Sequence, residues 1–477
     1  MRVVIIGGGA CGLCAALAAG EAGADVLVLE RDERPTGSTS LSQGLIPAAG
    51  TRLQRAKGIE DTPALMAADI QAKARGGADP AVVEALCAAS GPAIDWLTEA
   101  HGLDLHVVDD FLYPGMSRHR MHGSPNQDGA ELQSALLAAV QRAGIDMLTE
   151  ARAQDLFADA AGRIGAVSFA RPGGTVETVG ADAVVLACNG FGGAPALVRQ
   201  YMPEIADADY WGHAGNTGDA LAWGTALGAA TADLGAYQGH GSVAPAFGLP
   251  LTWAVVTGGG IQVNLHGERF ANEMRGYSEH AVEVLKQPGR AAWSLYDARC
   301  EGPALGFEEY RQLQALGAVK HADGIAALAR VTGLPEPALA RTMADIAAWS
   351  AGRGLDPLGR DFAHNFAHNF AHDFAHDFAQ TPPLTPPYRA VRTGGALFHT
   401  QGGLVIDPAA RVLRADGTPL PNLFAGGGAA RGVSGPASWG YLAGNGLLTA
   451  VVLGRIAGTG AALSTDAAGR LPGGSAH

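Results

Sequence analysis

Three glycines near the N-terminus have the spacing of a turn that binds dinucleotides. Gly7, Gly9 and Gly12 follow the pattern G-x-G-x-x-G, and Glu30 stands 18 residues after Gly12. One glycine of such a turn permits a sharp bend, one lets the backbone approach a pyrophosphate, and one lets a helix pack against a strand. The pyrophosphate lies at the N-terminus of that helix, and the acidic residue binds ribose hydroxyls. These residues therefore predict a dinucleotide site.

The elements that must hold this turn can be recognised in the same stretch of sequence. Residues 3–6 are a short, apolar, β-branched run, which predicts a buried strand. Residues 15–22 are predicted as a helix of small residues, and residues 25–30 as a second strand that ends in Glu30. The order of strand, helix, strand and acid makes the motif far more specific than the glycines alone.

Three further polar segments are candidates for ligand contacts, and each has a plainer alternative. Residues 37–44 form a small polar turn after the second strand, which is either a second nucleotide contact or a surface loop. The loop at 109–123 is dense in Tyr, Arg and His, and it either faces a substrate or is solvated. Residues 216–219 precede a predicted helix and form either an ordinary N-cap or a phosphate contact.

Cysteine and histidine patterns could suggest metal or redox chemistry, but neither pattern is specific for it. Cys11 and Cys14 form C-x-x-C inside the phosphate turn and its helix, where packing or backbone contact is the better interpretation. Residues 362–379 repeat the tetrapeptide FAHN or FAHD, which would place His side chains at i and i+4 on a helix. No acidic or Cys ligand set completes a site there, so we predict no metal and favour a low-complexity expansion.

The bulk composition excludes several classes of function. The chain has 477 residues and a formal net charge of −13, which argues against nucleic acid binding because phosphates need a basic surface. The 68 glycines and 17% charged residues fit a compact α/β protein rather than disorder. The five cysteines form no disulfide ladder, and the first strand leaves no room for a signal peptide. With no apolar run of about 20 residues, we expect a cytoplasmic protein without a membrane span.

The order of the predicted elements indicates an α/β protein in which a second domain interrupts the first. The remaining helices are predicted at 62–100, 132–142, 220–227, 280–286, 308–316, 322–331, 336–350 and 444–456. The remaining strands are predicted at 146–156, 164–169, 183–187, 261–264, 396–399, 403–407 and 421–428. We divide the chain into a nucleotide-binding part (1–236), an inserted capping domain with the repeat (237–387), and a return to the nucleotide-binding part (388–477).

Six motifs, in order along the chain, resemble those of one flavoprotein family. After the glycine turn they read LACNG (186–190), TGDA (217–220), GERFANE (267–273), HTQGGLVID (399–407), LFAGGG (423–428) and GYLAGNGLL (440–448). Together they resemble the fumarate reductase/succinate dehydrogenase flavoprotein superfamily, which includes 3-ketosteroid Δ1-dehydrogenases and urocanate reductases. The resemblance extends from residue 1 to about residue 458. It implies FAD held between a Rossmann-like FAD-binding domain and an inserted α+β capping domain.

The resemblance also implies which residues touch the cofactor. By motif position they are Gly7, Gly9, Ala10, Cys11, Gly12, Glu30, Arg31, Thr39, Ser40, Gln43, Gly44, Ala153, Ala187, Asp219, Gly426, Gly427, Asn445, Gly446 and Leu447. Covalently flavinylated members carry a His near the polar turn, and Ser38 occupies that place here. The resemblance therefore implies FAD that is bound non-covalently.

The resemblance transfers to the active site only in part. His399 matches the fumarate reductase His that contacts a substrate carboxylate. Tyr277 stands where fumarate reductases have a proton-donating Arg and ketosteroid dehydrogenases have a proton-accepting Tyr; Arg275 lies two residues earlier. Tyr441 stands at the place of a second Arg that clamps the other carboxylate. These departures shift the prediction from a dicarboxylate toward a carbonyl compound.

Desaturation beside a carbonyl needs a donor to the carbonyl, a base for the α proton and an acceptor for the β hydride. Tyr277 is the predicted base; its ordinary pKa of about 10 would have to be lowered, and Arg275 is a cation that could do so. His399 and Tyr441 are the predicted donors, and Arg431 could supply a replacement positive charge. Plainer roles stay open: a buried, satisfied phenol for Tyr277, a backbone hydrogen bond for His399 and a salt bridge for Arg431.

Several functions are compatible with the sequence. The first is FAD-dependent desaturation next to a carbonyl or carboxylate, and the second is reduction of an activated alkene such as fumarate or urocanate, which His399 and Arg275 favour. The third is a non-catalytic flavin-binding sensor or assembly protein, and the fourth is a dehydrogenase that uses only a nicotinamide. Since the chain has no C-x-x-C-H haem motif, we expect an external electron partner. The sequence leaves the substrate, the direction and the oligomeric state open.

Overall fold

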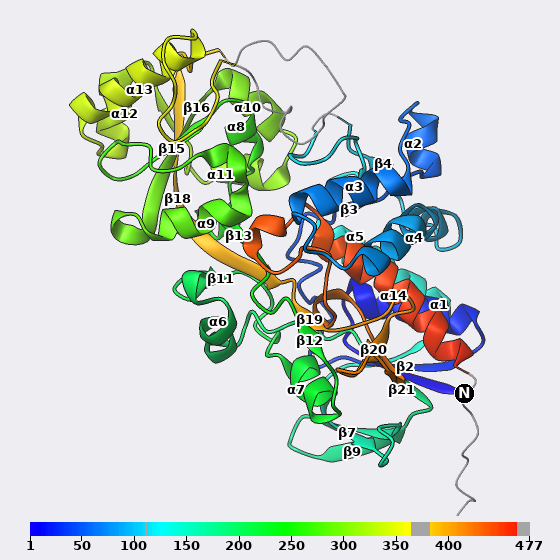
Figure 1. Cartoon of the computed structure of the whole chain (residues 1–477). Coiled ribbons are helices and arrows are strands. Elements are labelled where there is room, and N and C mark those ends of the chain that lie inside the picture. Colours follow the sequence, from blue (N-terminus) through cyan, green and yellow to red (C-terminus); the bar gives the residue numbers. More distant parts are fainter. Residues whose placement is uncertain (110–111, 364–381, 465–477) are drawn as a thin grey trace, which may run out of the picture.

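The computed structural model describes residues 1–109, 112–363 and 382–464 (Figure 1). Its nucleotide-binding part is built on a sheet with the strand order β20-β21-β10-β1-β2-β6, which is parallel except for β20 at one edge. These strands span Arg411–Leu413 (β20), Pro419–Ala425 (β21), Ala183–Leu186 (β10), Arg2–Ile6 (β1), Asp25–Leu29 (β2) and Asp146–Leu148 (β6). Because β1 pairs with β2 on one side and β10 on the other, a crevice opens at its carboxyl end, where such sheets bind ligands.

Two helices from opposite ends of the chain pack side by side over this sheet, α1 (Ala10–Glu21) and α14 (Asn445–Leu463) (Figure 1). Their close contact depends on glycine, since a Cβ on Gly454 would lie 2.4 Å from the Cys11 carbonyl oxygen. Among the described helices, α14 is the one long and apolar enough to cross a membrane, by length and composition alone. Half of it is buried in the protein core against α1, which accounts for its apolar composition.

The other elements of this part partly follow the sequence predictions. The helices are α2 (Arg52–Ala56), α3 (Pro63–Lys73), α4 (Pro80–Glu99), α5 (Gly129–Arg142), α6 (Pro195–Tyr201) and α7 (Asp219–Ala226). Small sheets are formed by β3 (Ile46–Pro47), β5 (Met121–Gly123) and β4 (His106–Val107); by β7 (Arg152–Ala158), β8 (Ile164–Ala170) and β9 (Val176–Gly180); and by β12 (Thr231–Ala232) and β19 (Gly403–Leu404).

Three predicted elements differ from the structure. The helix predicted at 62–100 is two helices, α3 and α4, and the first helix begins at Ala10 rather than at residue 15. The strand predicted at 146–156 is wrong: β6 and β7 belong to different sheets. Glu150, between them, has a φ of +52°, so the chain turns at this residue and cannot continue as one strand.

The cap is a second layer built on a sheet with the order β14-β13-β18-β16-β15, to which β11 and β17 add by pairing with β18. The strands span Leu249–Pro250 (β14), Tyr237–Ala244 (β13), Tyr388–Thr400 (β18), Ala291–Asp297 (β16), Ile261–Val263 (β15), Asp209–Tyr210 (β11) and Lys320–Ala322 (β17). Its helices are α8 (Ala254–Thr257), α9 (Tyr277–Leu285), α10 (Ala298–Ala304), α11 (Glu308–Ala315), α12 (Ile325–Thr332) and α13 (Glu336–Ser350).

The long strand β18 connects the cap to the nucleotide-binding part (Figure 1). Tyr388 and Val391, near its start, pack in the cap core, and Leu397, near its end, packs in a separate cluster beside α6. The predicted fold class is confirmed: a Rossmann-like α/β domain carries an inserted α+β cap. The domain boundaries at residues 237 and 387 stay predictions, and residues 364–379 of the repeat lie outside the described residues.

Candidate active site

One continuous cavity lies between the carboxyl edge of the nucleotide sheet and the cap, and many of the predicted cofactor residues line it. These are Gly7, Gly9, Ala10, Cys11, Glu30, Arg31, Thr39, Gln43, Ala153, Ala187, Asp219, Gly427, Gly446 and Leu447. Tyr277, His399 and Tyr441 line the same cavity. The structure therefore brings the glycine turn and three of the predicted catalytic residues to one cavity.

The other predicted cofactor residues lie behind the cavity wall. A Cβ on Gly12 would lie 1.8 Å from the Gly7 carbonyl oxygen, and a Cβ on Gly44 would lie 2.8 Å from the Asp128 carbonyl oxygen. Gly426 has similar close neighbours, and the Ser40 hydroxyl donates to the Gly37 carbonyl over 3.3 Å. Gly12, Ser40, Gly44, Gly426 and Asn445 thus support the shape of the cavity without lining it.

The first turn after β1 is a cradle that a side chain would fill. Gly7 has a φ of +112°, and a Cβ there would lie 2.5 Å from the Ala187 carbonyl oxygen. Gly9 is the N-cap of α1 and has no side chain to cap the helix. The next amide, that of Ala10, donates to Thr39 Oγ1 over 3.0 Å. This arrangement leaves the backbone at the helix N-terminus open to a phosphate group.

The acidic anchor of the cradle is Glu30. Its carboxylate accepts from the Gly8 amide at 2.7 Å and from the Asp32 amide at 2.9 Å. These bonds fix the carboxylate at the end of β2, beside the cavity. Each oxygen has further acceptor capacity, which suits the ribose hydroxyls of a dinucleotide.

The start of α14 closes the other end of the cradle. Gly444, its N-cap, has a φ of +80°, and Gly446 packs so closely on His399 that a Cβ would lie 2.8 Å from the ring. The Asn445 amide nitrogen donates to Ser434 Oγ over 3.0 Å. Its buried Oδ1 has no hydrogen-bond partner among the described residues. The open N-terminus of α14, together with the glycine turn and the carboxylate of Glu30, suits a dinucleotide, so the residues present fit FAD.

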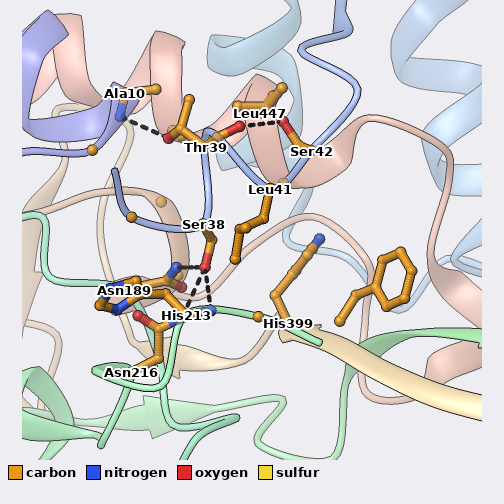
Figure 2. A pocket seen from close by; sticks show the side chains of 18 of the residues that line it. Ala10, Ser38, Thr39, Leu41, Ser42, Asn189, His213, Asn216, His399 and Leu447 are labelled. Carbon is orange, nitrogen blue, oxygen red and sulfur yellow. Dashed lines mark hydrogen bonds between the residues drawn. The ribbon is translucent and has the colours of Figure 1, made fainter. Parts of the chain in front are cut away.

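Ser38 is the centre of a polar cluster that the sequence did not identify (Figure 2). Its hydroxyl oxygen accepts from Asn216 Nδ2 at 2.9 Å, from Asn189 Nδ2 at 3.2 Å and from the His213 amide at 3.3 Å. His213 also approaches Asp32, with Nε2 2.8 Å from the carboxylate. Asn189, His213 and Asn216 all line the cavity. Asn189 lies in the LACNG motif, and Asn216 lies in the segment 216–219 for which the sequence left a phosphate contact open. His213 was missed because it lies in a loop with no recognisable spacing.

Aromatic rings surround the part of the cavity next to the cap. The ring centroid of Tyr277 lies 5.0 Å from that of His240 and 6.2 Å from those of Trp253 and Tyr441. The His399 and Tyr441 centroids are 5.5 Å apart. This wall is suited to a flat or apolar molecule with a polar group between the phenols and the imidazole.

The two phenols are protonated at neutral pH. Burial raises the pKa of Tyr277 well above its ordinary value of 10, and neighbouring Tyr441, Tyr113 and Glu279 raise it further. Burial also raises the pKa of Tyr441. The prediction that Arg275 lowers the pKa of Tyr277 is therefore wrong, because desolvation and the neighbouring phenols and carboxylate dominate.

The predicted His399 is an uncharged imidazole. Burial lowers its pKa to about 4. Its Nδ1 lies 3.1 Å from Gln401 Nε2 and 3.3 Å from the Thr400 carbonyl oxygen, so this nitrogen is engaged beside the end of β18. At neutral pH the residue can donate or accept a hydrogen bond, but it brings no positive charge to a substrate.

The two predicted cations are not brought to the main cavity. Arg431 is paired with Asp233, at 2.6 Å, and with Asp79, at 3.3 Å, so its charge is neutralised within the protein. Arg275 lines a second, smaller cavity behind Tyr277 and Tyr441.

For the loop at 109–123, the sequence left open whether it faces a substrate or is solvated. In the structure, part of the loop faces the main cavity and part of it is buried in the core. Tyr113, Pro114 and Met121 line the main cavity. Arg120 is buried and paired with Asp61 and Asp69, and it is therefore part of the core. Residues 110–111 lie outside the described residues.

Comparison with known proteins agrees with this geometry. The family model "FAD binding domain" matches residues 2–447. A probable fumarate reductase, Ifc3, of Shewanella frigidimarina is 31% identical over 466 residues, which cover 97% of this chain and 74% of that protein. The open conformation of a flavocytochrome c3 fumarate reductase superposes with a TM-score of 0.78 at 27% identity, covering 97% of this chain and 78% of that one.

A dehydrogenase structure is similar over nearly all of both chains. The 3-ketosteroid-Δ4-(5α)-dehydrogenase of Rhodococcus jostii RHA1, in complex with 4-androstene-3,17-dione, has a TM-score of 0.73 at 25% identity and covers 96% of each chain. These findings confirm the resemblance recognised in the sequence. The chain belongs to the FAD-binding domain family and is an FAD-dependent oxidoreductase of the fumarate reductase/succinate dehydrogenase flavoprotein superfamily, which acts on CH–CH or activated C=C bonds.

Proposed function

We propose that this protein desaturates the Cα–Cβ bond next to a carbonyl group of a small molecule, with Tyr277 as the residue that takes the α proton. The observation that supports this most is the pair of phenols, Tyr277 and Tyr441, on one cavity wall at the two places where the resemblance puts arginines of fumarate reductases. A dicarboxylate would lose both of its charged partners there. A carbonyl needs only neutral hydrogen-bond donors, and the surrounding rings suit the apolar part of its molecule.

Under this proposal, one group of residues around the cavity binds the cofactor and another binds the substrate. The glycine turn, Glu30 and the start of α14 would hold FAD, which when bound supplies the acceptor for the β hydride. Ser38 carries a hydroxyl already engaged with three nitrogens, which supports non-covalent binding. His399 and Tyr441 would donate to the carbonyl oxygen as it becomes enolate-like, which lowers the barrier for loss of the α proton.

The reverse reaction, reduction of an activated alkene, is a second candidate. It is favoured by the pKa of Tyr277, which lies well above 10, so that the phenol carries its proton at neutral pH. A protonated phenol can give a proton to the α carbon of an enone directly. As a base, it must first lose that proton.

Anaerobic spectroscopy of the holoenzyme distinguishes the two directions. If the protein is a desaturase, the flavin absorbance bleaches with a ketone panel of cyclohexanone, a carboxylated cyclohexanone and 4-androstene-3,17-dione. If it is a reductase, prereduced enzyme is reoxidised by fumarate, urocanate or a cyclic enone. Tyr277→Phe should lower turnover by about 100-fold or more while the flavin stays bound. Full activity of this variant would exclude the proton-transfer role.

Three further properties belong to the same proposal. The substrate is a small molecule with a carbonyl or carboxylate, and the electrons are exchanged with an external partner. Acid precipitation should release yellow flavin into the supernatant, as expected for non-covalent FAD. A cytoplasmic location fits the five cysteines, all of which are free thiols in the structure.

A further inference from the structure

A second cavity lies directly behind the two phenols. Its volume is about 30 Å³, which is room for a water molecule or two. Tyr277 and Tyr441, together with Pro114 and Trp253, line this cavity as well as the main one, so these four residues form the partition between them. Lys73, Arg275 and Glu279 line this second cavity and do not line the main one.

Glu279 links this small cavity to the solvent. It lies in the first turn of α9, two residues after Tyr277, and accepts from Lys73 Nζ over 2.7 Å. The same ammonium donates to the Arg275 carbonyl over 3.2 Å. The side chains of Glu279 and Lys73 are 21% and 10% exposed, so the carboxylate has one side on the cavity and another on the surface.

The backbone at Gly276 keeps this position open for the carboxylate. Gly276 has a φ of +131°, and a Cβ there would lie 2.5 Å from Glu279 Oε2 and 3.2 Å from Lys73 Nζ. The glycine therefore lets the carboxylate fold back over the start of α9, toward the partition. Any larger residue would push it away.

The charges around Glu279 come from several elements. Lys73 and Arg75 approach it from α3 and the turn that follows, Arg275 from the turn before α9, and Tyr237 from β13. Burial raises the pKa of Glu279, and Lys73 opposes this rise. A carboxyl group with a raised pKa takes up and releases protons closer to neutral pH than an ordinary one.

We propose that Glu279 is a proton relay, which exchanges the substrate proton held by Tyr277 with solvent through water in the second cavity. This rests on the proposed function, since it takes Tyr277 as the residue that handles that proton. In desaturation the Cα–H bond breaks, its electron pair forms the Cα=Cβ bond, and the β hydride leaves for the flavin. Because Tyr277 Oη carries a proton at rest, that proton passes through water to the Glu279 carboxylate and then to solvent as Oη takes the α proton from the substrate. The relay carries one proton and no electrons, while Lys73 stays protonated.

The test compares variants of two carboxylates on the same helix. Glu279→Gln keeps the size of the side chain and an acceptor for Lys73 but cannot carry a proton. Glu283→Gln is the matched control, because Glu283 also lies on α9 and pairs with Lys286 over 2.8 Å at the exposed surface. Holoenzymes are assayed with the fastest member of the ketone panel, or of the alkenes if the enzyme is a reductase, across pH and in D₂O.

The relay predicts a specific set of changes. Glu279→Gln should lower kcat by about tenfold or more, with KM nearly unchanged and a larger solvent isotope effect, and added formate should restore part of the rate. Glu279→Asp should restore much of it, and Glu283→Gln should behave as the wild type. Lys73→Met keeps the carboxylate but raises its pKa, so the limb of the pH profile that depends on Glu279 should move to higher pH.

Two outcomes would overturn the relay. One is a wild-type kcat and pH profile in Glu279→Gln. The other is equal losses of activity and thermal stability in Glu279→Gln and Lys73→Met without formate rescue, which would mean that the pair only ties α9 to α3. Failure of the proposed function looks different, because Tyr277→Phe would then be fully active. An inactive Tyr277→Phe beside a normal Glu279→Gln excludes the relay alone.

Discussion

The third glycine of the N-terminal turn offers a sharp test of how the cofactor site is built. Replacing Gly12 with Ala would place a Cβ 1.8 Å from the Gly7 carbonyl oxygen, where real Cβ atoms stay beyond 3.0 Å. The turn or α1 must therefore move by about 1.2 Å. The turn has little room to move, because Gly7 already packs tightly against the backbone of Ala187.

We expect this overpacking to cost about 1–3 kcal/mol, which corresponds to an FAD affinity about 5- to 150-fold weaker if the strain falls on the bound state. The assay is the dissociation constant of FAD, from flavin fluorescence, with circular dichroism to check that the apoprotein folds. Gly20→Ala, in the same helix, is the control, because its Cβ would meet only the end of the Ile145 side chain at 3.2 Å. Equal FAD affinities of Gly12→Ala and Gly20→Ala would refute the reasoning.

Two further predictions concern charge. Arg431→Met should leave the kcat of the holoenzyme within about twofold of the wild type but lower the melting temperature, since it leaves Asp79 and Asp233 without their partner; a selective loss of substrate affinity would instead restore Arg431 to the active site. Burial lowers the pKa of His122, His280 and His399 to about 4, below the unfolded value of about 6.5. Since the unfolded chain binds more protons between these values, stability should fall as pH drops from about 6.5 toward 4; a denaturation midpoint that is constant over this range would contradict the burial of these imidazoles.

Local signals made part of this structure predictable. The strand β1, the glycine turn and Glu30 are specified by neighbouring residues, and Gly7 and Gly12 each have backbone so close that a Cβ would clash with it. The motif positions of Tyr277 and Tyr441 also placed both phenols on one cavity wall. In these cases the sequence carries the information because the geometry is set by residue types at fixed spacing.

The features of the site that depend on contacts between residues far apart in the sequence could not be predicted. Arg431 looked like a free cation in a glycine-rich loop, but its partner Asp79 lies 352 residues earlier in the chain. The pKa of Tyr277 was predicted from its neighbour in sequence, Arg275, whereas in the structure burial and groups from other elements decide it. Neither interaction leaves a local pattern, so charge balance inside the fold could not be derived from spacing.

The separation of the cofactor site from the substrate site explains how one fold can serve both oxidation and reduction. The cradle for the cofactor depends on backbone shape, which glycines fix, and it says nothing about the substrate. The substrate side depends on the side chains that the cap and the loop before α14 present to it. A charged pair there would bind carboxylates, while Tyr277, Tyr441 and the neutral His399 offer only hydrogen bonds. Under the proposed function, the bond that is oxidised or reduced is set by a few side chains on the cap side of the cavity, and the proposed relay gives their proton a route to solvent between Glu279 of α9 and Lys73 of α3.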